Sequence, residues 1–277
     1  MKFWISLMLL TFSLPTWAER LFDIEVVVFK RNVSPETTQE AWPDDISAVD
    51  TSKAGLLSSD EYRESKGVTL LSGDQFQLNT AVSELKRHAG FQVLLHTAWR
   101  QNDAGKRSAP RFHLQAGNDF AALFNEDGSP FQTIEPSPVE GVSEMSIPNP
   151  VYELDGTVQV YVEHYLYANI DLDLREPYSR EVPVIQPQTD TLAQDNSSVD
   201  PFTVNTASSD AGDVKAGNLA AIEAPQTQIE TVLKRYRLEQ KRRMRSGETH
   251  YFDHPLLGII LQVRKVEEGS DSASSAQ

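Results

Sequence analysis

Two stretches of the 277-residue sequence place side chains that could recognise a ligand on one face of a strand. In residues 157–174, apolar residues occupy the even positions and polar or aromatic residues the odd ones, which is typical of a strand with one buried face. Tyr161, Tyr165 and Tyr167 share the odd positions, and their flat rings with a polar tip suit sugar rings. These residues are a candidate glycan-binding stripe. The alternative is that tyrosine simply favours strands and that the helix or a loop covers these rings. His164 falls on the even face, which predicts a hydrogen-bonded core histidine.

Residues 234–245 form a basic segment with seven basic residues and one acid. Read as a strand, one of its faces carries Arg235, Arg237, Lys241, Arg243 and Arg245. Guanidinium groups hold carboxylates through paired hydrogen bonds, so this face is a candidate site for the carboxylates of a ligand or for an acidic partner. The alternative is a structural role, either cross-strand pairing with Glu163, Asp171 and Asp173 or protection of an edge strand from aggregation.

Catalytic and metal-binding patterns are weak. His250 and His254 are four residues apart with Asp253 beside the second, a spacing that suits zinc on a helix, but the neighbouring Tyr, Phe and Pro residues favour a hairpin connection. Asp171 and Asp173 could resemble an acid/base pair, although two acids on a solvated strand face are the more common arrangement. The sequence has no G-x-S-x-G, S-x-x-K or P-loop pattern. We therefore expect no catalytic residues, no cofactor and no metal.

The elements that must position these residues begin with a β-branched strand at 22–29. Apolar residues at helical spacing predict a helix over 78–89, which Gly90 ends, and an apolar strand follows at 91–99. This order of strand, helix and strand permits a parallel pairing through a right-handed crossover. Asp155 and Gly156 predict a tight turn before the long alternating segment.

We predict an α+β fold, a single domain dominated by an antiparallel β-sheet with one clear packed helix, long loops and a disordered insertion. The insertion has six acids against one lysine and is rich in Pro, Gln, Ser and Thr, so it cannot bury enough apolar surface to order itself. The expected divisions are a signal peptide at 1–18, the first part of the domain at 19–181, the insertion at 182–228, C-terminal strands completing the same domain at 229–267, and a mobile tail at 268–277.

The first residues predict export. Lys2 gives a positive start, an apolar run covers 3–14, and small residues precede an expected cleavage after Ala18. The run of about twelve residues is shorter than the about twenty that a membrane span needs, so no membrane span is expected. The sequence has no cysteine, which excludes disulfides, thiol chemistry and a lipid-bearing cysteine and favours the bacterial periplasm.

The charge balance excludes one class of partner. Lys and Arg total 25 against 40 Asp and Glu, a formal net charge of -15. Such a field repels nucleic acid and anionic lipid at long range. We therefore expect no nucleic-acid partner.

Four stretches together resemble the CsiV family of periplasmic peptidoglycan-binding proteins: FDIEVVVFKRN, LKRHAGFQVLLHTAWRQ, GTVQVYVEHYLYANIDLDLR and YRLEQKRRMRSGETHYFDHPLLGIILQV. The resemblance covers most of the expected ordered core. It implies an accessory factor for cell-wall assembly that acts with the outer-membrane lipoprotein LpoA, the activator of a class A penicillin-binding protein. It carries no family site residue onto this sequence.

The sequence thus predicts a non-catalytic periplasmic protein that binds peptidoglycan and supports cell-wall synthesis, through LpoA. One alternative is a metal-dependent wall hydrolase that uses His250, Asp253 and His254. Another is an outer-membrane assembly or chaperone-like factor that pairs an exposed sheet edge with client proteins.

Overall fold

The computed structural model describes residues 20–43, 46–131, 149–183 and 227–267. The elements follow in this order: β1 (Leu21–Arg31), η1 (Pro35–Thr37), β2 (Gly55–Leu56), α2 (Asp60–Ser65), β3 (Thr69–Leu70), η2 (Gly73–Gln75), α3 (Asn79–Arg87), β4 (Phe91–Asn102), β5 (Arg111–Asp119), β6 (Tyr152–Val162), β7 (Leu166–Pro183), β8 (Thr227–Met244), β9 (Thr249–Asp253) and β10 (Leu257–Lys265). Among the described residues, no helix has the length and apolar character needed to cross a membrane.

The chain forms two compact units, Met1–Tyr178 with Val232–Gln277, and Ser179–Thr231. In the second unit, the described residues Arg180 and Glu230 form an ion pair at 2.9 Å. The core and the faces described below belong to the first unit. The expected signal peptide, the expected tail and all but the ends of the expected insertion (182–228) lie outside the described residues.

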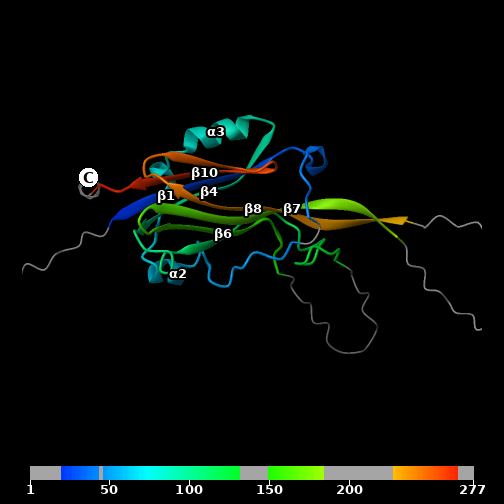
Figure 1. Cartoon of the computed structure of the whole chain (residues 1–277), viewed down its shortest axis with the longest axis horizontal. Helices are drawn as coiled ribbons and strands as arrows, with labels where there is room; N and C mark the ends of the chain where they lie inside the picture. The colour runs from blue at the N-terminus through cyan, green and yellow to red at the C-terminus, as the bar shows by residue number, and fades with distance from the viewer. Residues whose placement is uncertain (1–19, 44–45, 132–148, 184–226, 268–277) are drawn as a thin grey trace, which may run out of the picture. The chain divides into compact units, whose positions relative to one another are not determined.

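Two five-stranded sheets make up the first unit, where one sheet was expected. The first has the strand order β3-β4-β1-β10-β9 and the second the order β2-β5-β6-β7-β8. The neighbouring strands of the first sheet pair antiparallel, as do β5 with β6 and β6 with β7 in the second, whereas β2 and β5 pair parallel. The two sheets lie one above the other in Figure 1. The expected β-dominated α+β class is confirmed.

One hydrophobic core joins the two sheets. Alternation along β1 turns Ile24 and Val26 inward, and alternation along β7 turns Ile170 and Leu172 toward them. All four side chains are fully buried, as is Trp99 of β4 in the same cluster. Because each sheet buries only one face here, each has an outer face left for another role.

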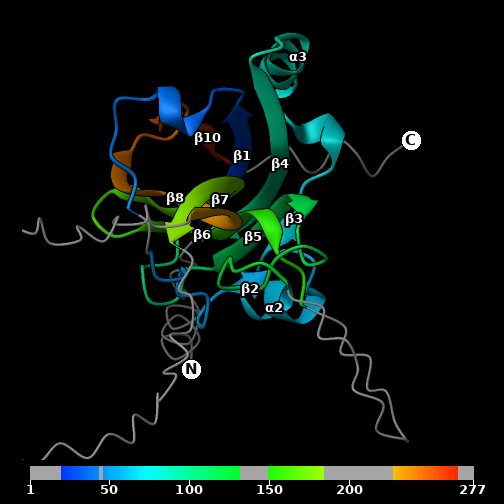
Figure 2. The ribbon, with the colours of Figure 1, turned by 90° about the vertical axis from the view of Figure 1, so that its right-hand side faces the viewer.

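Helix α3 covers the outer face of the first sheet, which confirms the expected packed helix. Leu78 and Val82 form a small cluster with Val27 of β1, and Val93 and Ile260 pack against it. Figure 2 shows α3 beside β4, with the strands of the second sheet on the other side of the first. The helix therefore belongs to one sheet only.

A buried carboxylate ties α3 to this sheet. Glu25 of β1 is fully buried and accepts hydrogen bonds from the backbone N–H groups of Gln77 (2.8 Å) and Leu78 (2.9 Å), at the start of the helix. His96 (2.8 Å) and Arg264 (2.9 Å) bind the same carboxylate. Burial opposes ionisation of Glu25, but these hydrogen bonds outweigh it and hold the pKa of Glu25 below its ordinary value.

The parallel pairing that the order of strand, helix and strand permits is not formed. Strands β1 and β4 pair antiparallel, with Arg31 opposite Phe91. The reason lies in where α3 ends: the N–H of Asn32 bonds the carbonyl of Gly90, so the helix returns the chain to the end of β1. A strand that starts there must run back along β1.

The segment expected as one long strand is a hairpin of β6 and β7. Tyr161 pairs with Tyr167 and Val162 with Leu166, so partners have the same parity and the alternation continues through the turn. For this reason the sequence pattern showed no break. His164 lies in the turn and is exposed, which corrects the expected core histidine. Gly156, expected in a turn, lies inside β6.

Candidate functional site

The outer face of the second sheet brings together the residues that the sequence singled out. Odd-numbered side chains of β6, β7 and β8 point away from the core, and these strands are neighbours. Near the β6–β7 turn, this face carries aromatic and basic side chains. Toward the other end of the strands, it carries acids, an arginine and a histidine. Between Tyr167 and Arg175 on β7, eight steps of about 3.3 Å separate these two ends by about 26 Å.

The three tyrosines of the expected stripe differ in exposure. Tyr161 has none of its surface exposed and stacks on Tyr167, with ring centroids 5.5 Å apart and an angle of 20° between the rings. Tyr165 lies in the β6–β7 turn and is 48% exposed. Tyr161 therefore supports the other rings from within, and Tyr165 is the ring that a ligand can reach most directly.

Basic side chains of β8 lie against these rings. The guanidinium carbon of Arg243 is 3.4 Å from the ring centroid of Tyr165, and the ammonium of Lys241 is 5.2 Å from that of Tyr167. Such cation–π contacts hold a long side chain in place without removing its charge. We call Tyr165, Tyr167, Lys241 and Arg243 the aromatic–basic surface. The two candidate surfaces of the sequence thus meet in one place.

The other basic residues of β8 have different surroundings. Arg237 binds both carboxylate oxygens of Asp173 at 2.8 Å, so the structural alternative applies to this residue. Arg235 donates to the carbonyl of Ile46 at 3.0 Å and to the carbonyl of Glu126 and so holds two loops. Arg245 is exposed, with Glu248 at 3.5 Å. Only part of the expected basic face is therefore available to a ligand.

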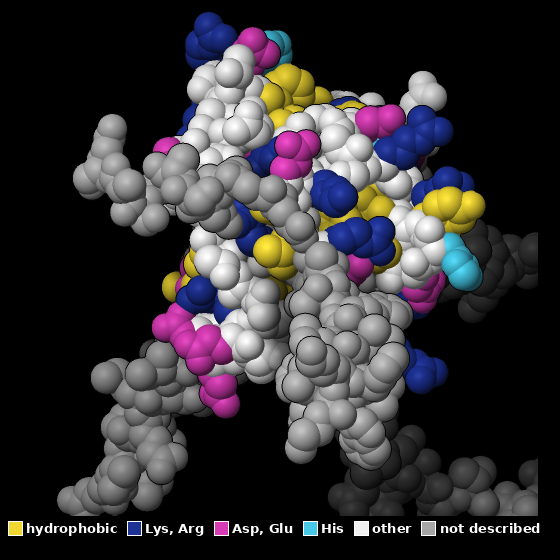
Figure 3. All heavy atoms as spheres, turned by 90° about the vertical axis from the view of Figure 1, so that its left-hand side faces the viewer, with side chains coloured by type: hydrophobic (Ala, Val, Ile, Leu, Met, Phe, Trp, Pro, Cys, Tyr) yellow, Lys and Arg dark blue, Asp and Glu magenta, His cyan; other side chains and the backbone are white. Residues whose placement is uncertain are grey.

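The end of the molecule that carries the β6–β7 turn and the end of β8 faces the viewer in Figure 3. Lys and Arg side chains surround exposed hydrophobic side chains there, and Asp and Glu side chains gather lower on the same view. A basic area on a chain with a net charge of -15 means that the charges are unevenly distributed. Such an area attracts anionic groups locally despite the overall field.

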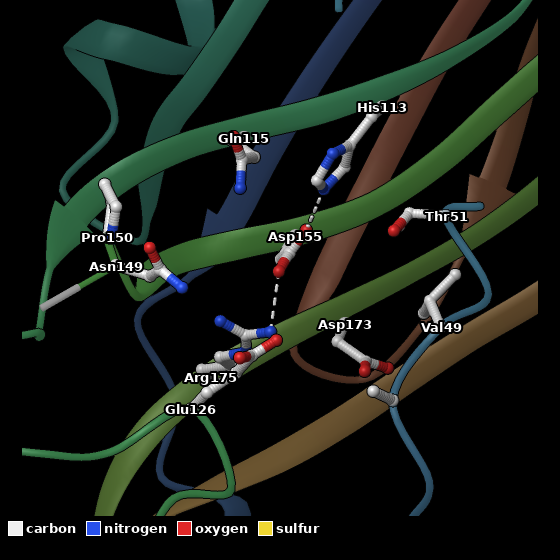
Figure 4. Close-up of a pocket in the computed structure, with 11 residues that line it drawn as sticks. Val49, Thr51, His113, Gln115, Glu126, Asn149, Pro150, Asp155, Asp173 and Arg175 are labelled. Carbon is white, nitrogen blue, oxygen red and sulfur yellow. Dashed lines mark hydrogen bonds and ion pairs between the residues drawn. The ribbon is translucent and has the colours of Figure 1, made fainter. Parts of the chain in front are cut away.

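A polar cavity of about 210 Å³ opens on the same outer face, toward the other end of the strands. Its lining comes from the loop before β2, from β5, β6 and β7, and from the segments before β6: Ala48, Val49, Thr51, His113, Gln115, Glu126, Asn149, Pro150, Asp155, Asp173 and Arg175. Figure 4 shows His113, Asp155 and Arg175 in line along the cavity.

Asp155 is the centre of the charged part of this cavity. It binds His113 Nε2 at 2.5 Å and Arg175 Nη2 at 2.6 Å. Burial raises the pKa of Asp155, but the His113 hydrogen bond and the Arg175 charge outweigh it, so the pKa lies below the ordinary value. The carboxylate stays ionised at neutral pH and holds the side chains of His113 and Arg175 in place.

His250, Asp253 and His254 do not converge on a common point. His250 Nε2 accepts the backbone N–H of Arg245 at 3.2 Å, and Asp253 binds Arg31. His254 is buried, and its Nδ1 accepts the N–H of Leu256 at 3.2 Å. Among the described residues, no group of three or more His, Cys, Asp or Glu could hold a metal ion.

The sequence interpretation missed the cavity. Arg175 continues the odd-numbered series of β7 one step beyond the segment that was interpreted, so the alternation was the signal that could have found it. His113 and Gln115 lie on β5, and the sequence does not show that β6 is its neighbour. Thr51 and Asn149 lie in irregular segments whose sequence carries no signal of proximity.

The fold and this face define a β-dominated α+β protein with two sheets, one of which carries the aromatic–basic surface on its outer face. The chain belongs to the CsiV family: the family model described as "Peptidoglycan-binding protein, CsiV" matches residues 2–266. This confirms the resemblance found in the sequence. No match was found among curated proteins or among solved structures.

Proposed function

We propose that this protein binds peptidoglycan in the periplasm, without catalysis, and supports cell-wall synthesis. One observation carries the choice of site: Arg243 on Tyr165 and Lys241 on Tyr167 form a single charged and aromatic surface. Membership in a family of peptidoglycan-binding proteins supports the ligand. The expected export signal at 1–18 supports the compartment.

The two kinds of side chain suit the two parts of peptidoglycan. Its short peptides carry carboxylates, which Arg243 and Lys241 can bind. Its sugar rings present apolar faces, which can stack on the exposed ring of Tyr165. Because the cation–π contacts already hold the basic side chains, less conformational entropy is lost on binding.

Co-sedimentation with purified sacculi tests this proposal. We expect the wild-type protein to sediment at low salt and the double variant Lys241→Ala/Arg243→Ala to bind about tenfold more weakly. Lys86→Ala/Arg87→Ala is the matched control, because it removes two exposed basic residues from α3 on the other sheet. Wild-type protein that stays in the supernatant, or equal losses in both double variants, would contradict the proposal.

We also propose that the wall-synthesis role runs through LpoA, and the family resemblance supports this partner. Pull-down of purified LpoA with the purified protein tests it separately. Retention above a bead-only background is the expected result. No retention, with sacculus binding intact, would reject the partner and leave the wall-binding function standing.

A further inference from the structure

We propose that the polar cavity between the loop before β2 and strands β5, β6 and β7 binds a short peptide that bears both an ammonium and a carboxylate. The inference rests on the proposed function and deepens it, because the diamino-acid peptides of peptidoglycan are ligands of this chemistry. It assigns one peptide to the cavity and leaves the sugar rings and the carboxylates of neighbouring peptides to the aromatic–basic surface.

The cationic side of the cavity is a buried arginine with unused hydrogen-bonding capacity. Arg175 is only 5% exposed, yet Asp155 takes one end of its guanidinium and the bond of Nη1 to the Tyr152 carbonyl is long, at 3.5 Å. Its Nε has no hydrogen-bond partner among the described residues. A buried cation is costly unless it is fully paired. A ligand carboxylate near Arg175 and His113 would give the guanidinium a further acceptor beside Asp155, where its Nη1 has only the long contact to Tyr152.

The anionic side of the cavity attracts an ammonium. The side chain of Glu126 lines the cavity and makes no hydrogen bond or ion pair among the described residues. Asp173 also lines it and is almost completely buried, with Arg237 on its two oxygens. The cavity therefore offers charges of both signs, as Figure 4 shows for Asp173, Glu126 and Arg175.

Neutral polar groups complete the lining. The Gln115 and Asn149 amides and the Thr51 hydroxyl all line the cavity, and none of them makes a hydrogen bond among the described residues. Amides and hydroxyls are the usual partners of a peptide backbone, since each can donate and accept. Three such groups around one cavity provide hydrogen-bonding capacity that no residue in the described part of the chain uses.

This combination discriminates among ligand classes. A phosphate would face Asp155, Asp173 and Glu126, and like charges oppose its entry. A neutral sugar would leave the Glu126 carboxylate without a charged partner among the described residues, whereas a ligand ammonium would pair with it. The volume of about 210 Å³ is below the range of about 300–1,000 Å³ for drug-sized ligands, so it suits the end of a peptide. A zwitterionic peptide end satisfies all three conditions.

Isothermal titration calorimetry on the full mature protein tests the inference. The probe is the soluble tripeptide L-alanyl-γ-D-glutamyl-meso-diaminopimelic acid, and the comparison ligand is chitotetraose, which has no peptide. Gln115→Leu removes an amide that makes no hydrogen bond to the residues the structure describes, so folding should be unaffected. Gln92→Leu is the matched control, because Gln92 is an exposed strand residue of the first sheet.

We expect the tripeptide to bind wild type and Gln92→Leu equally and Gln115→Leu about tenfold more weakly, with sacculus binding through the aromatic–basic surface retained. Wild-type protein that sediments with sacculi but does not bind the tripeptide overturns this inference alone. Equal tripeptide binding by wild type, Gln115→Leu and Thr51→Val also overturns it. If neither sacculi nor tripeptide binds, this inference and the proposed function both fail.

Discussion

The outer faces of the two sheets use polar side chains in opposite ways. On the first sheet, Glu25 uses both carboxylate oxygens for hydrogen bonds within the fold. It binds two backbone N–H groups at the start of α3 and the side chains of His96 and Arg264. On the second sheet, Gln115 and Thr51 line a cavity with no partner among the described residues. A saturated polar group stabilises the fold, whereas an unused one is available to a ligand. The contrast supports the proposal that the outer face of the second sheet is the one that binds peptidoglycan.

The largest expected effect is the loss of stability when the buried carboxylate on the outer face of the first sheet is removed. Glu25→Ala leaves His96 and Arg264 without their shared partner and removes the acceptor for the start of α3. Removing one member of a buried charged network costs about 3–5 kcal/mol, so we expect a loss of this size in the free energy of unfolding. Denaturant unfolding measures it. Glu61→Ala on α2 is the exposed control, and an equal loss in both variants would contradict the role of Glu25.

His254 serves as a contrast to both outer faces. Its pKa is strongly shifted, but it lies on neither of them. Burial, helped by the charge of Arg31, lowers the pKa of His254 to about 4 from 6.5. As the pH falls, the unfolded chain therefore takes up this proton before the folded chain does. The free energy of unfolding keeps its full value above about pH 6.5 and falls by up to about 3 kcal/mol as the pH drops toward about 4. A shifted pKa here indicates burial and does not mark a binding site.

Denaturant unfolding as a function of pH measures this effect. His254→Asn keeps an acceptor for the Leu256 N–H and removes the titrating ring, so the slope between about pH 6.5 and pH 4 should become shallower. His88→Asn is the matched control, because exposed His88 accepts the N–H of Gly90 at 3.1 Å in the same way. An unchanged slope in His254→Asn would show that another group carries the pH dependence.

A smaller effect is expected from the exposed ring of the second sheet. Tyr165→Ala removes the stacking surface but leaves Arg243 in place, so sacculus binding should weaken by about threefold to tenfold. Phe131→Ala removes another exposed aromatic ring, which is 46% exposed, and should have no effect. Co-sedimentation compares the two. If Tyr165→Ala binds sacculi as well as wild type, the stacking role of Tyr165 is wrong and the charges of Lys241 and Arg243 alone account for binding.

Part of this fold could be predicted from the sequence because strand alternation is a local property. The odd and even positions of 157–174 gave the correct faces for Tyr161, Asp171 and Asp173, even though the hairpin turn was missed. The face of β8 was also correct. In contrast, the binding of Arg235 to the carbonyls of Ile46 and Glu126 joins segments far apart in the chain. No periodic pattern encodes such contacts.

The same distinction applies to the candidate site. The aromatic–basic surface could be partly predicted, because its members lie on strands with a clear alternation, although their meeting depends on β7 and β8 being neighbours. The cavity could not be predicted, because Thr51, Glu126 and Asn149 come from irregular segments. Sites of this second kind need the tertiary structure.

Amide hydrogen exchange with and without soluble peptidoglycan fragments tests most directly whether the outer face of the second sheet is the recognition face. We expect added protection in β5, in β7 from Leu166 to Tyr178 and in β8 from Val232 to Met244, with α3 and β4 unchanged. Protection confined to α3 and β4 would contradict the account, because it would place the ligand on the face that Glu25 and the helix already occupy.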